Sequence, residues 1–164
     1  MIPLARPVLD GNESRYLQDC IDTTYVSSVG PFVTSFEKQV AEATGSPAAV
    51  ATSSGTTALH IALVACGVGP DDLVVLPSFT FIASANAISH CGAAPWLVDI
   101  DKETWSLDTK LLRRCLSEDT RRDGDRLLHR ASGRRVAAIM PIYTLGSPSD
   151  MDAKIGRASC RERV

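Results

Sequence analysis

The sequence predicts an α/β fold with three layers, in which a mainly parallel sheet lies between helices. Short apolar runs alternate along the chain with stretches of about ten residues whose apolar positions recur at helical spacing, and this alternation is typical of βαβ units. The runs are continuously apolar, as expected for strands covered on both faces. Such strands are parallel, and the crossovers between them are right-handed.

The elements can be predicted in chain order. A short amphipathic helix follows Asp10, and a second helix begins at Pro31 and stops at Gly45, because proline suits a first turn and glycine a helix end. Further along, turn residues separate apolar runs from helical patterns. The expected strands are 48–51, 73–76, 95–100 and 136–140, and the expected helices are 56–66, 79–91 and 108–116.

One stretch, 118–135, interrupts this rhythm with many arginines and aspartates. Its composition predicts a solvated, mixed-charge excursion between a helix and a strand. A contact with a nucleotide phosphate is the alternative for its arginines.

The composition of the 164 residues, 45% hydrophobic and 22% charged, is ordinary for a globular protein. The formal net charge of −2 argues against a nucleic-acid partner, which needs a concentrated basic face. No apolar run is long enough for a membrane span, and the first residues are too short and proline-broken for a signal peptide. A cytoplasmic location is therefore the default expectation.

The cysteines are scattered singly, and no CxxC pair suggests a zinc or redox site. They are therefore predicted to be small core residues. The five are Cys20, Cys66, Cys91, Cys115 and Cys160.

The last ten residues, 155–164, break the composition of the chain and resemble the in-frame translation of a widely used DNA-sequencing adapter. We interpret them as a non-native tail and assign the fold to residues 1–154. A native helix end rich in arginine is the alternative.

The first motif that carries chemistry, Ser53 to His60, lies at a predicted strand-to-helix turn. A helix N-terminus offers free amide groups and the positive end of the helix dipole. Gly55 allows close approach of an anion, and Thr56 and Thr57 add hydroxyl donors, so the turn can form a phosphate cradle. An ordinary serine or threonine N-cap is an equally good interpretation of this motif alone.

The second motif carries Phe79 and Phe81 at the carboxyl end of the next strand, where ligands of open α/β sheets collect. These rings could offer a flat face to a flat cofactor ring or serve as core anchors. In the third motif, Asp101 and Asp108 fit turn and capping roles. With no histidine or third carboxylate near Asp99 and Asp101, no metal site is expected.

In this order and spacing, the motifs resemble the DegT/DnrJ/EryC1/StrS family of sugar aminotransferases, which are fold-type-I enzymes dependent on pyridoxal 5′-phosphate (PLP). The resemblance covers nearly all of residues 2–153. The matching segments are 25–32 with 36–37, 54–60, 77–87, 98–101 with 107–108, and 141–152.

The resemblance implies a partial large domain whose Gly55, Thr56 and Thr57 hold the PLP phosphate, while Phe81 stacks on the pyridine ring. It implies a parent protein that moves an amino group from an amino acid, glutamate, to a nucleotide-linked keto sugar. It also implies homodimers, in which residues 25–31 reach a neighbouring site. Two departures bear on the sugar: a histidine common near 143–144 is absent, and the excursion 118–135 is longer than usual.

The family's Schiff-base lysine lies beyond residue 153, so the chain is expected to hold no catalytic residue and to be inactive by itself. Three alternatives remain. The parent could be a PLP-dependent sugar dehydratase or a non-catalytic regulatory protein on the same fold. The chain could also be an incomplete gene product without a cellular role.

Overall fold

A computed structural model describes residues 6–146. The predicted tail 155–164, Cys160 and the segment 147–152 lie outside these residues. The described chain divides into two compact units, with the boundary between Ala51 and Thr52.

The first unit contains two helices, α1 (Glu13–Asp22) and α2 (Pro31–Thr44). Helix α2 begins with Pro31 in its first turn and ends at Gly45, whose φ of 67° is left-handed, so both predicted boundaries are confirmed. The strand predicted at 48–51 is wrong: Val50 is 81% exposed, and the amide of Ala51 donates to Glu37 Oε1 at 2.8 Å. A strand needs a neighbour that completes its ladder, and none of the described strands pairs with these residues.

The second unit is built on a parallel sheet with the strand order β2-β1-β5. The strands are β1 (Leu73–Pro77), β2 (Ala94–Val98) and β5 (Val136–Ile139), and the helices are α3 (Gly55–Ala65), α4 (Ile82–His90) and α5 (Thr109–Glu118). A short 3-10 turn, η1 (Thr144–Gly146), follows β5. The predicted strands 73–76, 95–100 and 136–140 are therefore confirmed to within two residues at each end.

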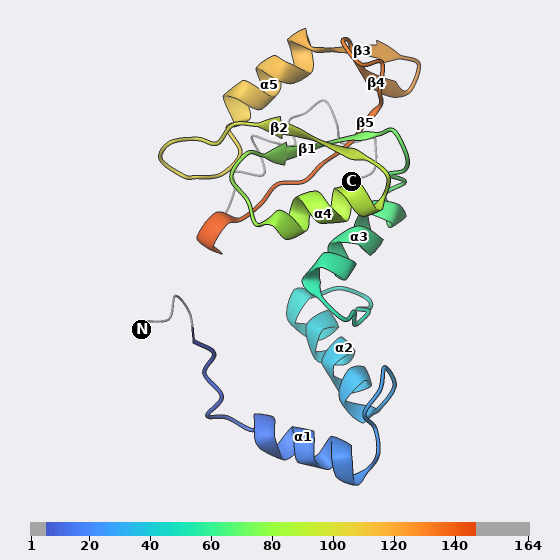
Figure 1. Ribbon diagram of the computed structural model, residues 1–164, viewed down its shortest axis with the longest axis vertical. Helices are drawn as coiled ribbons and strands as arrows, with labels where there is room; N and C mark the ends of the chain where they lie inside the picture. Colours follow the sequence, from blue (N-terminus) through green and yellow to red (C-terminus); the bar gives the residue numbers. More distant parts are fainter. Residues whose placement is uncertain (1–5, 147–164) are drawn as a thin grey trace. The chain divides into compact units, whose positions relative to one another are not determined.

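The central strand β1 alternates its side chains between two apolar clusters. Val74 and Leu76 pack in one cluster with residues of α3 and α4. Val75 packs in the other with Leu107 and with Leu112 of α5. Figure 1 accordingly shows α5 on one side of the sheet and α3 and α4 on the other. The predicted three-layer α/β architecture is thus confirmed.

The excursion 118–135 holds more structure than its composition predicted. It contains an antiparallel hairpin of β3 (Thr120–Asp123) and β4 (Arg126–His129). Asp123 pairs with Arg126, so Gly124 and Asp125 form a two-residue loop. Gly124 stands at its first position with a φ of 58°, and a Gly-Asp loop is a hairpin signal that the charge pattern concealed.

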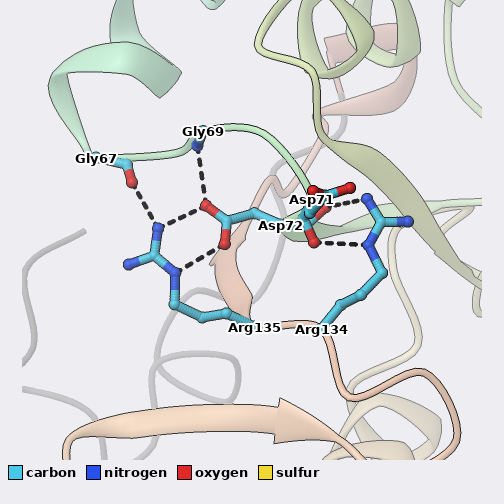
Figure 2. A network of polar contacts seen from close by, with 6 residues as sticks. All are labelled: Gly67, Gly69, Asp71, Asp72, Arg134 and Arg135. Atoms are coloured by element: carbon cyan, nitrogen blue, oxygen red, sulfur yellow. Dashed lines mark hydrogen bonds and ion pairs between the residues drawn. The ribbon is translucent and has the colours of Figure 1, made fainter.

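The excursion ends in two arginines that bind the chain just before β1 (Figure 2). Arg135 donates through Nε to Asp72 Oδ1 at 2.8 Å and through an amino group to Asp72 Oδ2 at 2.5 Å. The amide of Gly69 donates to the same Oδ2 at 2.9 Å. Arg134 donates to the backbone oxygens of Asp71 and Asp72. The predicted solvated excursion is therefore wrong at this end, because these guanidinium groups join β5 to β1.

The prediction for the cysteines is confirmed for Cys91, which is buried, and wrong for Cys66, which is exposed. Cys66 forms the C-cap of α3. Cys20 and Cys115 are half-buried.

None of the helices within residues 6–146 has the length and apolar character that a bilayer crossing requires.

Candidate functional site

The N-termini of α3 and α4 lie on one open groove of the second unit. The structure brings Gly55 and Thr56 together with Phe81 there, whereas Thr57 is not among the residues that line it. The remaining lining is small or apolar: Ala58, Leu59, Ala62, Ala83 and Ser84.

The start of α3 combines a helix cap with free amide donors. Ser54 is extended and its Oγ accepts a hydrogen bond from the amide of Thr57 at 3.2 Å, so the N-cap interpretation is confirmed. The amides of Gly55 and Thr56, in the first turn, make no hydrogen bond to any described residue. Because the cap engages only one amide, the turn still presents two donors and the positive end of the helix dipole.

Gly55 leaves space where an anion would approach these donors. A Cβ atom placed on Gly55 would meet no heavy atom within 4 Å, and its φ is not left-handed. The glycine is therefore not required by the backbone conformation. An open approach beside two unpaired amides is the arrangement that a phosphate group requires.

Phe81 forms the N-cap of α4 in an extended conformation and is 78% exposed. Phe79 is 45% exposed, so the alternative that these two rings are core anchors is wrong. The predicted start of this helix at Phe79 is also wrong, because the preceding residues are tied to β2: the amide of Ser78 donates to the carbonyl of Val98 at 2.9 Å. The helix begins only at Ile82.

The aspartates after β2 fulfil the predicted turn and capping roles. Asp101 Oδ1 accepts the amides of Glu103 and Thr104 at 3.0 and 2.9 Å, and Asp108 Oδ1 accepts those of Lys110 and Leu111 at 2.8 and 3.0 Å. Both turn assignments are confirmed.

Asp99 makes a contact that sequence reasoning missed. Its Oδ1 accepts the amide of Ile100 at 2.8 Å and the hydroxyl of Ser78 at 2.9 Å. These bonds stabilise the carboxylate and lower the pKa of Asp99, the amide of Ile100 contributing most. No local signal identifies this pair, because Ser78 and Asp99 are 21 residues apart in sequence.

The histidines within residues 6–146 contact other rings. The rings of His60 and His90 lie with centroids 5.6 Å apart, and His129 packs against Trp96. Among residues 6–146, no group of three metal-binding side chains is gathered. None of the lysines between residues 6 and 146 lines the groove.

Comparison with known proteins places this geometry in context. The sequence profile of the DegT/DnrJ/EryC1/StrS aminotransferase family matches residues 7–159. The GDP-perosamine synthase of Caulobacter vibrioides is 46% identical over 151 residues, which are 92% of this chain and 36% of that protein. The chain therefore spans little more than a third of the length of this curated relative.

Solved structures agree with the fold. An aminotransferase of the same family from Brucella abortus matches 92% of the chain and 38% of its own, with 28% identity and a TM-score of 0.73. NtdA of Bacillus subtilis, solved with bound cofactor PMP, matches 90% of the chain and 31% of its own, with 26% identity and a TM-score of 0.70.

Proposed function

Because the chain belongs to the DegT/DnrJ/EryC1/StrS aminotransferase family, we propose that its full-length parent transfers an amino group from glutamate to a nucleotide-linked keto sugar, with PLP as cofactor. The 46% identity to a GDP-perosamine synthase over 92% of the chain carries this proposal. It also makes a GDP-linked sugar the first substrate to test. Because the chain covers only 36% of that relative, the proposal concerns the full-length parent protein.

In this proposal, the α3 N-terminus holds the cofactor's phosphate. Gly55 and Thr56 donate their unpaired amides, and the space beside Gly55 admits the anion. The amide of Thr57 is engaged by Ser54, and its hydroxyl lies 3.0 Å from Ser54 Oγ. In this proposal Thr57 reaches the phosphate only by turning that hydroxyl from Ser54 toward the anion. The helix dipole adds to the attraction.

Phe81 orients the cofactor ring in the same proposal. Its ring is exposed and lines the groove with Gly55 and Thr56, so a flat ring held by its phosphate lies within reach of the aromatic face. The bound cofactor supplies an electron sink for the transfer. The apolar lining contributed by Leu59 and Ala62 keeps water from that side of the ring.

The lysine that binds the cofactor covalently is proposed to lie beyond residue 153, so the chain by itself binds without catalysing. The described lysines support this, since Lys38 pairs with Glu42 on α2 at 3.8 Å, Lys110 is on α5, and neither they nor Lys102 line the groove. Lys154 lies outside the described residues.

The resemblance also implies homodimers, and we include them in the proposal together with a cytoplasmic location. Exposed apolar side chains support an added interface: Val26 and Val29 are 73% and 71% exposed, and neither α1 nor α2 buries a residue in this chain. Light scattering of the parent protein tests the dimer.

The reaction is tested in reverse with the purified parent protein. GDP-perosamine and 2-oxoglutarate are supplied together with PLP, and the expected result is glutamate in equal amount to the keto sugar. A protein that binds PLP but forms no glutamate from GDP-perosamine or from a panel of other nucleotide-linked amino sugars contradicts the proposal. Loss of water from a GDP-linked sugar without nitrogen transfer identifies a dehydratase instead. Absence of both reactions with all the nucleotide sugars of the panel identifies a regulatory protein.

A further inference from the structure

Residues 78–81 join β1 to α4, have no regular secondary structure and carry Phe81 at their end. Their first residue is held on both main chain and side chain. The amide of Ser78 donates to the carbonyl of Val98, and its hydroxyl donates to Asp99 Oδ1, both at 2.9 Å. Since that oxygen also accepts the amide of Ile100, the Asp99 carboxylate has a fixed orientation and can anchor Ser78.

The second residue of this connection is held by an aromatic contact. The rings of Phe79 and Trp105 meet edge to face, with centroids 5.3 Å apart and planes at 83°, which is a favourable geometry for an aromatic pair. Trp105 belongs to the loop that follows β2, so this contact ties Phe79 to that loop.

Trp105 is itself kept in an uncommon backbone conformation. Its φ is 57°, in the left-handed region that bulky residues rarely adopt. Asp101 maintains it: the amide of Trp105 donates to the Asp101 carbonyl at 2.9 Å, and the Asp101 carboxylate closes the turn through Thr104. A strained residue persists only where its surroundings over-determine it, and such residues cluster at functional sites.

The far end of the connection is also fixed. The carbonyl of Phe81 accepts the amide of Ser84 at 3.1 Å, and the hydroxyls of Thr80 and Ser84 lie 3.2 Å apart. With both ends tied, the remaining freedom of Phe81 is set by how firmly Ser78 and Phe79 are held.

We propose that Asp99 and Trp105 are positioning residues, which act through Ser78 and Phe79 to fix Phe81 at the groove. This inference rests on the proposed function for its consequence, namely that a cofactor ring lies against Phe81. The contacts of Asp99 with Ser78 and of Trp105 with Phe79, which we call the clamp, do not involve the cofactor. They can therefore be tested in the cofactor-free protein.

The test uses the parent protein and six variants, of which Phe81→Ala removes the ring itself. Asp99→Ala and Trp105→Ala remove the two contacts. Asp99→Asn keeps an oxygen acceptor and Trp105→Phe keeps a ring, so both variants are expected to behave like the wild-type protein. Glu103→Gln is the matched control, since Glu103 is an exposed carboxylate of the same loop and joins the turn through its backbone amide. Its side chain makes no hydrogen bond to any described residue.

The first readout is hydrogen exchange of the cofactor-free protein. Peptides that cover 78–82 should exchange about tenfold faster in Asp99→Ala and Trp105→Ala, with peptides of the core strand β1 unchanged. Exchange at the control rate in both alanine variants overturns the inference, whatever the protein binds. Faster exchange that extends through β1 also overturns it, because it shows general loss of structure.

The second readout is PLP itself, followed by its dissociation constant and by the induced circular dichroism of the bound ring. The alanine variants should bind about three- to tenfold more weakly, with a smaller dichroic signal per bound molecule, and the conservative variants should recover both. If Phe81→Ala changes the dichroism and the two alanine variants do not, the positioning role is refuted while the proposed function stands. If the wild-type parent binds no PLP, the proposed function fails, and the exchange result alone judges the clamp.

Discussion

Replacing Asp72 with asparagine should destabilise the parent protein through loss of a single carboxylate. Asp72 is 7% exposed, and its oxygens accept two hydrogen bonds from Arg135 and one from Gly69. Asparagine keeps the shape and one acceptor oxygen, but it leaves the guanidinium of Arg135 without its counter-ion.

The size of the effect follows from burial. Breaking a fully buried ion pair costs about 3–5 kcal/mol, but the side chain of Arg135 is 40% exposed and water screens part of the charge. We therefore expect a loss of about 2 kcal/mol in the free energy of unfolding. The neighbouring Asp71→Asn is the control, because only the backbone of Asp71 joins the network.

The same group gives a pH dependence of known sign. Burial raises the pKa of Asp72, but the hydrogen bond from Arg135, the amide of Gly69 and the charges of Arg135 and Arg134 outweigh it and hold the pKa below the ordinary 3.8. A lowered folded pKa adds stability that is fully present above about pH 3.8 and is lost as the pH falls through the folded value.

The assay is urea unfolding followed by tryptophan fluorescence, for wild type and both variants, at several pH values. The difference between wild type and Asp72→Asn should stay constant from about pH 7 to pH 5 and narrow below about pH 3.8. A loss at pH 7 no larger than that of Asp71→Asn would refute the reasoning, as would a difference that grows as the pH falls.

Three further substitutions separate binding from stability. Gly55→Ala should weaken PLP binding about tenfold by placing a methyl group where the phosphate approaches, while the free energy of unfolding is unchanged or rises by about 0.5 kcal/mol. Gly69 has similar open space, so Gly69→Ala is the control in PLP titration and thermal unfolding. Phe81→Ala should weaken PLP binding about three- to tenfold and change stability by less than about 0.5 kcal/mol, because the ring is 78% exposed; a large drop in melting temperature would contradict this. Leu112→Ala, at a side chain 1% exposed, should cost about 3 kcal/mol in urea unfolding, and a cost below about 1 kcal/mol would contradict the assigned core.

Local signals in the sequence predicted most of the second unit. The strand β1 and the helix α3 follow from continuous apolar runs bounded by turn residues, and Asp108 was identified as a cap from its position alone. Such signals act within a few residues. They predict the observed elements wherever a neighbouring element completes the backbone hydrogen bonds. The run 48–51 has the same apolar pattern, but it has no regular secondary structure, and none of the described strands pairs with it.

The features that were missed depend on residues distant in sequence. Arg135 reaches Asp72 across 63 residues, so a charge pattern read along the chain could only suggest a solvated stretch. The start of α4 was misplaced for the same reason, since β2 holds Ser78 in place of the first helical turn. The hairpin at Gly124 is different: its Gly-Asp loop is a local signal, and only the surrounding charges obscure it.

The candidate site likewise combines a part that is set by neighbouring residues with a part that is set by residues distant in sequence. In the proposed site, the phosphate is bound by amides at the start of one helix, so Gly55 and Thr56 can be recognised as candidates from eight consecutive residues. The orientation of a bound ring is proposed to depend instead on where Phe81 is held. In that proposal Phe81 is positioned through the contacts of Asp99 with Ser78 and of Trp105 with Phe79, which come from the segment after β2. Changes confined to that loop can therefore alter how a bound ring is presented while the phosphate motif stays intact. A motif that identifies the cofactor class says correspondingly little about the substrate that the cofactor will meet.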